Sequence, residues 1–438
     1  MLFMNLKLPA LFAFLVTAIS LQAQNQVDLT MFNKNRGTRV AIKGQLVELT
    51  WPAGKSEKAR ITLNLENGQP LFSKFDLTKK GAFTTIVSQI DPAFILTVGK
   101  RTLDPASGGW DVFFDKVPQR PYHSQVVGFN KKTAAVISKG AQTIIRIAEL
   151  NAGLFSGVLE ITLYNGSPLL NIAAVVSTDR DSTAILYDAG LVMQSNGWKS
   201  IAWSDVNKKL QNESVVLQDS STNVEVKYRT IIGESKMGSL AVFPAPHQYF
   251  YPLDEAFNLR FCWYGNNYRN MLPGFGLGIR QDPLGDKRYV PWFNAPPKTL
   301  LRLNFFCLLS SDYADEALET VKRFTHGDSY KPVPGYKTFQ SHFHNEFITK
   351  VVLAGKPVPN VPEFVEVFRE TGVDIVHLAE FHGPGHPKGP DEERLKELDA
   401  LFDQCKRLSD KKFLLLPGEE ANNFYGGHWL AFFPNPVY

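Results

Sequence analysis

The stretch GVLEITLYNGSPLLNIAAVV, residues 157–176, has the pattern of two β-strands joined by a tight turn. Apolar and β-branched residues, which favour strands, recur in both halves. Asn165, Gly166 and Ser167 separate the halves, and Asn-Gly between two strand-like runs is the strongest short-range signal of a hairpin. The stretch therefore predicts a β-hairpin.

Similar strand-like runs recur on both sides of this hairpin, for example TNVEVKYRTII (222–232), FNLRFCWYG (257–265) and LLRLNFFCLLS (300–310). Such repetition, with turn residues between the runs, predicts a large all-β sandwich over residues 25–310. The chain has 438 residues, which is too long for one average domain, so we expect a second domain.

Aromatic residues are dense between Tyr249 and Phe306, and this density has two interpretations. The rings form part of the sandwich core, or they stack on sugars near polar loops. The stretch 247–299 resembles in style, without a catalytic motif, the sandwiches of carbohydrate-handling proteins of the galactose mutarotase-like group.

The charged residues argue against a nucleic-acid surface. The chain carries 47 basic and 43 acidic residues, a formal net charge of +4, and the basic residues are scattered. We therefore expect no nucleic-acid partner.

The beginning of the chain has the pattern of an export signal. Lys7 precedes an apolar run from Leu8 to Leu21, and Ala23 offers a small residue for cleavage. A membrane anchor is the alternative, but the run is short of the roughly 20 apolar residues of a spanning helix. We predict a signal peptide over residues 1–24, a secreted or periplasmic protein, and no transmembrane anchor after cleavage.

The three cysteines are too few for a disulfide framework. Cys262 and Cys307 lie in strand-like runs and form either one bridge or two buried free thiols, and Cys405 lies in the second domain.

Residues 311–335 predict a closing helix and a linker. Ser311 is placed as a helix cap, and Ala314, Leu318, Val321 and Phe324 follow at helical spacing. The next segment, YKPVPGYKT, contains two prolines and one glycine and is typical of a linker.

Beyond the linker, residues 336–438 alternate between strand and helix patterns. Strands are expected near 338–347, 373–381, 412–422 and 426–433, and helices near 362–372 and 390–409. This order predicts an α/β domain with a parallel sheet or barrel.

Six imidazole and carboxylate side chains fall near the ends of these strands: His342, His344, Glu380, His382, Glu420 and His428. Parallel α/β folds build their sites at the C-terminal edge of the sheet. His342 and His344 are two apart on one strand, so both side chains leave the same face, with Cα atoms roughly 6.5 Å apart. We predict that the six residues bind divalent metal ions. His386 is either a further ligand or a surface residue, and His377 is expected to pack against a helix.

In order, HFH (342–344), GVDIVHLAEFHG (372–383), LLLPGEEAN (414–422) and GGHWLAFF (426–433) resemble the first motifs of the PHP (polymerase and histidinol phosphatase) superfamily. The resemblance covers about 100 of the 438 residues. It implies a distorted α/β barrel, two or three zinc, manganese or iron ions, and hydrolysis of phosphate esters. By position, His342 and His344 match the first metal pair, His382 the second-motif histidine, Glu420 the bridging glutamate, and His428 a further motif histidine.

Two features depart from the family pattern. Phe381 stands where members usually have an aspartate, and Glu380 is our candidate for the missing carboxylate. A complete barrel needs roughly 200 residues, so we expect residues 336–438 to be the first part of a truncated domain.

The resulting hypothesis is an exported metal-dependent hydrolase, a phosphoesterase in the first instance, acting on a small-molecule or glycan-linked substrate. Glu420 and His382 would serve catalysis as ligands of the metal cluster that activates water. The alternative is a carbohydrate-binding or polysaccharide-processing protein whose second domain is degenerate, and a purely structural sandwich is a third possibility.

Overall fold

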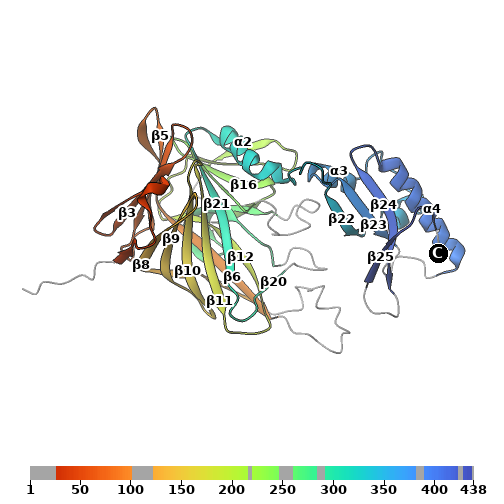
Figure 1. Ribbon diagram of the computed structural model, residues 1–438, viewed down its shortest axis with the longest axis horizontal. Helices are drawn as coiled ribbons and strands as arrows, with labels where there is room; N and C mark the ends of the chain where they lie inside the picture. Colours follow the sequence, from red (N-terminus) through yellow and green to blue (C-terminus); the bar gives the residue numbers. More distant parts are fainter. Residues whose placement is uncertain are drawn as a thin grey trace, which may run out of the picture.

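The computed structural model describes residues 26–100, 122–215, 220–245, 260–283, 292–380, 389–422 and 428–436. The predicted signal peptide therefore lies outside the described residues. Figure 1 shows a large β-rich part that contains β3 to β21 and a smaller part, at the C-terminal end of the chain, that contains β22 to β25. Among the described residues, no helix is both long and apolar enough to cross a membrane.

Ten strands form the first sheet of the sandwich. In spatial order they are β1 (Gln26–Asp28), β8 (Gly128–Lys139), β9 (Gln142–Ala152), β10 (Phe155–Tyr164), β11 (Leu169–Thr178), β21 (Leu301–Ser310), β17 (Ser239–Phe243), β16 (Lys227–Glu234), β13 (Ser200–Ser204) and β14 (Leu210–Ser214). β10 and β11 pair antiparallel with Leu163 opposite Leu170, which confirms the predicted hairpin.

The second sheet contains eleven strands. In spatial order they are β15 (Ser221–Val224), β18 (Cys262–Tyr268), β19 (Leu272–Ile279), β12 (Thr183–Met193), β6 (Ala82–Lys100), β5 (Phe72–Lys79), β4 (Lys58–Asn64), β3 (Leu46–Pro52) and β2 (Arg39–Lys43), with β20 (Phe293–Asn294) beside β12 and β7 (Tyr122–Val126) beside β6. The short 3-10 turn η1 (Lys34–Arg36) precedes β2.

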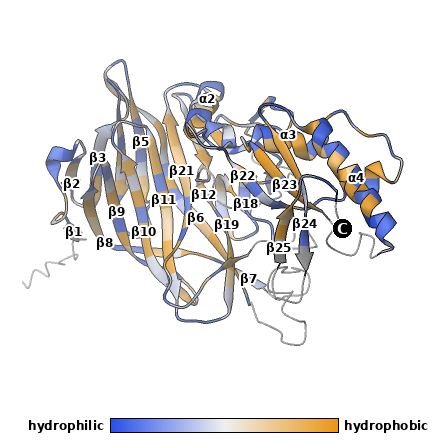
Figure 2. Ribbon diagram, turned by 45° about the vertical axis from the view of Figure 1, so that its right-hand side comes forward, coloured by the Kyte–Doolittle hydropathy of each residue, from blue (hydrophilic) through white to orange (hydrophobic). Residues whose placement is uncertain are grey.

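The core of the sandwich lies between the two sheets. Phe94 of the second sheet and Phe305 of the first are each at most 1% exposed, and their ring centroids are 5.7 Å apart. Figure 2 shows hydrophobic residues concentrated along central strands such as β21 and β12. The predicted all-β sandwich is therefore present.

Two of the clustered aromatic residues lie in the core, and the state of the three cysteines is settled. Trp263 and Tyr268 are buried and stack with ring centroids 3.9 Å apart, as the core interpretation predicts. Cys262, Cys307 and Cys405 are all free and buried, so the interpretation as free thiols is confirmed and the bridge is wrong.

The predicted closing helix is α2 (Ala314–Thr325), followed by the 3-10 turn η5 (His326–Asp328). Its apolar residues pack on the outer face of the first sheet, against side chains such as Leu308. The predicted cap Ser311 is wrong, because Tyr313 occupies the N-cap position and makes no side-chain cap hydrogen bond. Instead, the carboxylate of Glu234 on β16 accepts a 2.7 Å hydrogen bond from the Ala314 N–H. A strand distant in sequence thus caps the helix.

The smaller unit has the predicted order of strands and helices. Its elements are β22 (Phe339–Phe343), the π-helical turn η6 (Ile348–Val352), α3 (Glu363–Glu370), β23 (Ile375–Glu380), α4 (Asp391–Leu408), β24 (Leu414–Asn422) and β25 (His428–Phe432). The strands lie in the order β22-β23-β24-β25, and the first three are parallel.

The three strands of the β-α-β-α-β order are parallel, as predicted, whereas the fourth strand, β25, runs antiparallel to β24. Only residues 423–427 separate the two strands, whereas a parallel crossover needs a dozen or more residues. Within the described residues the four strands form an open sheet, and the distorted barrel that the PHP resemblance implies is not shown.

Both helices of this unit contribute to one core with the sheet. Val376 on β23 and Leu415 on β24 form a separate buried cluster with Val365 of α3 and Leu398 of α4. Two successive β-α-β crossovers lead to parallel neighbouring strands, and the helices of both pack into the same cluster. The opposite face of the sheet is therefore free to carry polar side chains.

Candidate metal centre

The first strand of the smaller unit positions two of the predicted ligands. The register of β22 against β23 shifts between Gln340 and Phe343, so that Ser341 and His342 stand opposite the single residue His377. This arrangement is a β-bulge, which re-aims the side chains that follow it.

Three predicted ligands come together at the C-terminal ends of β22 and β24. The Nε2 atom of His342 lies 2.7 Å from Nε2 of His344 and 2.8 Å from Oε2 of Glu420. Nε2 of His344 is also 2.8 Å from Oε2 of Glu420. The side chain of Glu420 is 2% exposed, whereas those of His342 and His344 are 43% and 35% exposed. A buried carboxylate therefore forms the floor of the cluster and two imidazoles form its open side.

The donor set fits a divalent cation. Two imidazole nitrogens and one carboxylate oxygen are ligands that zinc and similar metals take in proteins. Ligand atoms bound at about 2.1 Å lie about 3.4 Å apart around a tetrahedral ion and about 3.0 Å apart around an octahedral one, and the observed 2.7 to 2.8 Å are nearer the octahedral spacing. Without a cation, only shared hydrogen bonds could hold these three lone-pair atoms so close together. The three residues form the only group of this kind among the described side chains.

The other predicted ligands are not brought into the cluster by the described atoms. The backbones of Glu380 and His428 are placed, with Glu380 paired to Glu419 and His428 paired to Asn422, but their side chains lie outside the described part. His382 and His386 lie outside the described residues altogether.

His377 differs from its prediction. It is fully buried but packs against Phe432 of β25, with ring centroids 4.8 Å apart, and not against a helix. The physical reason is that both helices cover the other face of the sheet. Its Nδ1 lies 2.9 Å from the carbonyl oxygen of Ser341. Burial lowers the pKa of His377, and the carbonyls of Ser341 and Ala431 act in the opposite direction.

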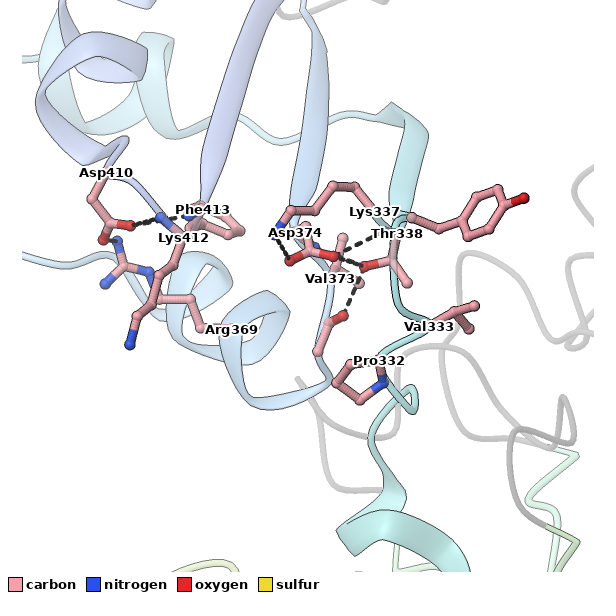
Figure 3. A pocket seen from close by; sticks show the side chains of 12 residues that line it. Pro332, Val333, Lys337, Thr338, Arg369, Val373, Asp374, Asp410, Lys412 and Phe413 are labelled. Atoms are coloured by element: carbon pink, nitrogen blue, oxygen red, sulfur yellow. Dashed lines mark hydrogen bonds and ion pairs between the residues drawn. The ribbon is translucent and has the colours of Figure 1, made fainter.

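A large cavity of about 640 Å³ lies at the opposite end of the same sheet, where the parallel strands begin. Figure 3 shows that its polar side chains bind one another: Arg369 pairs with Asp410, and Lys337 and Thr338 hold Asp374. These contacts satisfy the groups locally, and parallel α/β folds place their chemistry at the other edge. We therefore place the candidate site at His342, His344 and Glu420.

Comparison with known proteins identifies no family for this chain. No family model matches it, and no curated protein sequence matches it. Among solved structures, a GH36 alpha-galactosidase, AgaB, from Geobacillus stearothermophilus is similar with a TM-score of 0.41 and 9% identity, over 87% of this chain and 56% of that chain. The galactosidase domain of an alpha-galactosidase-sucrose kinase, AgaSK, is similar with a TM-score of 0.37 and 8% identity, over 87% of this chain and 57% of that chain.

An alpha-mannosidase from Enterococcus faecalis V583 matches with a TM-score of 0.31 and 9% identity, over 64% of this chain and 31% of that chain. The chain thus spans little more than half the length of the first of these enzymes. TM-scores below 0.5 establish neither a family nor a function, and the PHP resemblance stays a prediction.

Proposed function

We propose that this chain belongs to a metal-dependent hydrolase whose cation is held by His342, His344 and Glu420. The single observation that supports this most strongly is the convergence of their three donor atoms: both imidazole nitrogens lie 2.8 Å from the Glu420 carboxylate, which is 76 and 78 residues away in sequence. A buried carboxylate needs hydrogen-bond donors or a cation, and two imidazole nitrogens that converge on one carboxylate oxygen give the donor set of a metal site.

The three side chains would divide the work of holding the cation. A bound divalent cation would supply Lewis-acid charge stabilisation and would lower the pKa of water at the site. Glu420, from the interior strand β24, contributes the negative charge and is kept from bulk water. His342 and His344 leave the other side of the cluster partly exposed, which gives a substrate access. By the PHP resemblance we assign phosphate esters as the first substrate class to test, with His382 and His428 as further ligands.

The test is a comparison of metal content and hydrolysis. The purified chain is loaded with Zn²⁺ or Mn²⁺, its bound metal is measured by mass spectrometry, and turnover of an aryl phosphate is followed. We expect at least one ion per chain, and loss of both bound metal and turnover in a His342→Ala, His344→Ala variant. His123→Ala removes an exposed histidine on β7 and serves as the matched control. Less than one ion per chain in the wild type contradicts the proposal.

A second candidate function is carbohydrate binding or processing by the sandwich. It is motivated by a groove of about 200 Å³ whose lining combines Tyr264, Phe275, Asn266 and Thr222. Aromatic faces beside hydrogen-bonding groups are a common way to hold a polar ring. The hydroxyl of Tyr264 hydrogen-bonds the carboxylate of Glu213, which fixes the ring at the wall of the groove.

The two candidates give opposite results with the same variants. If the sandwich is the functional part, oligosaccharide binding measured by calorimetry should be lost in Tyr264→Ala and kept in the His342→Ala, His344→Ala variant. If metal hydrolysis is the function, the histidine variant alone should lose activity. We also propose, from the sequence of residues 1–24, that the protein is exported, which fractionation of the producing cells would test.

A further inference from the structure

The bulge in β22 decides on which face of the sheet the two histidines lie. Phe339 lies before the bulge and contacts an aromatic ring of β25, with centroids 6.5 Å apart, on the face away from the helices. Phe343 lies after the bulge and packs on α3. In an unbroken strand, side chains four residues apart share a face. Since these two do not, the inserted residue has switched the alternation. This switch places His342 and His344 on the face that carries Glu420.

A bulge leaves part of the strand ladder without its regular partner. At this bulge the Ser341 carbonyl lies 2.9 Å from Nδ1 of His377, the residue directly opposite on β23. A carbonyl oxygen can only accept, so Nδ1 carries the proton and donates. The imidazole thus takes the place of a backbone N–H at the one irregular position of the strand.

The surrounding side chains hold the His377 ring in a fixed position, so the ring can in turn fix the position of the Ser341 carbonyl. It is fully buried, and the Phe432 ring meets it in an edge-to-face contact. A Cβ atom at Gly418 would come within 3.0 Å of both the His377 ring and the Ala431 carbonyl. Only glycine on the neighbouring strand therefore leaves space for the imidazole.

We propose that His377 is a positioning residue that fixes the β22 bulge through the Ser341 carbonyl and thereby aims His342 at Glu420. This positioning role rests on the proposed function, because it presupposes that His342 binds the metal ion. His377 itself does not contact the cation. Partners that orient metal ligands typically contribute 10- to 100-fold to metal affinity.

The test uses Co²⁺, whose visible spectrum reports the ligand geometry, on the full chain. His377→Leu removes the donor at similar volume, and His377→Asn returns an amide N–H near the position of Nδ1. We expect about 10- to 100-fold weaker Co²⁺ binding and an altered spectrum in His377→Leu, and recovery to within about threefold of wild type in His377→Asn. Val376→Ala is the matched control, because Val376 is equally buried on the same strand but faces the helices. It should leave Co²⁺ affinity and spectrum unchanged.

Should His377→Leu not fold, His377→Gln replaces it in the comparison, because its amide reaches the position of Nε2 and not that of Nδ1. We then expect the asparagine variant to bind Co²⁺ more tightly than the glutamine variant. Equal binding by the wild type and His377→Leu, or by the asparagine and glutamine variants, overturns the positioning role. A wild-type chain that takes up no Co²⁺ overturns the proposed function itself, and the positioning role with it.

Discussion

Replacing Gly418 by alanine adds only one methyl group, but we expect it to destabilise the smaller unit strongly. Gly418 lies in β24, between β23 and β25, and has no open side in the sheet. The added Cβ would come within 3.0 Å of the Ala431 carbonyl oxygen and of the His377 ring. Overpacking of a well-filled site costs about 1–3 kcal/mol. Because one of the two obstructing atoms is backbone fixed in a strand ladder, we expect about 3 kcal/mol. That corresponds to roughly a hundredfold smaller ratio of folded to unfolded unit.

Hydrogen exchange followed by mass spectrometry measures this effect locally. A local measurement is necessary because stability differs between parts of a structure, and a global unfolding signal would be dominated by the large sandwich. Peptides from β22 to β25 should exchange faster in Gly418→Ala, whereas peptides from the sandwich should not change. Gly128→Ala is the control, since a Cβ at Gly128 meets its nearest atom, the Asn151 carbonyl oxygen, at an ordinary 3.8 Å. Exchange of the β24 and β25 peptides at the wild-type rate in Gly418→Ala would refute the reasoning.

Two further predictions concern the sandwich and the cysteines. Burial alone would raise the pKa of Glu234, but hydrogen bonds from Ser200, Asn212 and the start of α2 hold this pKa below its ordinary 4.5. The ionised carboxylate therefore stabilises the fold above pH 4.5. This stabilisation is lost as the pH falls through the lowered pKa. The Glu234→Gln variant should therefore unfold at a lower temperature than the wild type at neutral pH, and its unfolding temperature should depend less on pH between about 3 and 5. Unfolding temperatures of wild type and variant that change equally with pH across that range would count against this role. The three cysteines should resist a thiol reagent at pH 8 until the chain is unfolded, because all are buried and burial raises the pKa of Cys307 far above its usual value. Labelling of the native chain would show that the thiols are accessible.

Local sequence patterns predicted the elements well. The Asn-Gly turn at 165–166 specified a hairpin because its flanking runs had strand character on both sides. The spacing of His342 and His344, and the position of Glu420 near the end of a later strand, were enough to predict that the three side chains meet. Such predictions succeed because they depend on alternation and on strand order, which one sequence displays directly.

Features that depend on pairing between distant strands could not be predicted in this way. The bulge at Ser341 changes which face Phe339 occupies relative to Phe343, and nothing in the segment itself marks the extra residue. The positioning role that we propose for His377 depends on that bulge, so the sequence did not indicate it. The direction of β25 was predictable in principle from the short segment 423–427, because so few residues cannot cross the sheet.

The cluster of His342, His344 and Glu420 joins the first strand of the smaller unit to the third, across β23 and both helices. Its donor atoms therefore come together only when β22 and β24 both lie in place on either side of β23. A cation that prefers this geometry would bind the folded unit and not the unfolded one, and at a hundred times its dissociation constant it would add about 2.7 kcal/mol to the stability of the unit. Occupancy of the cluster would then measure how completely residues 336–438 have folded.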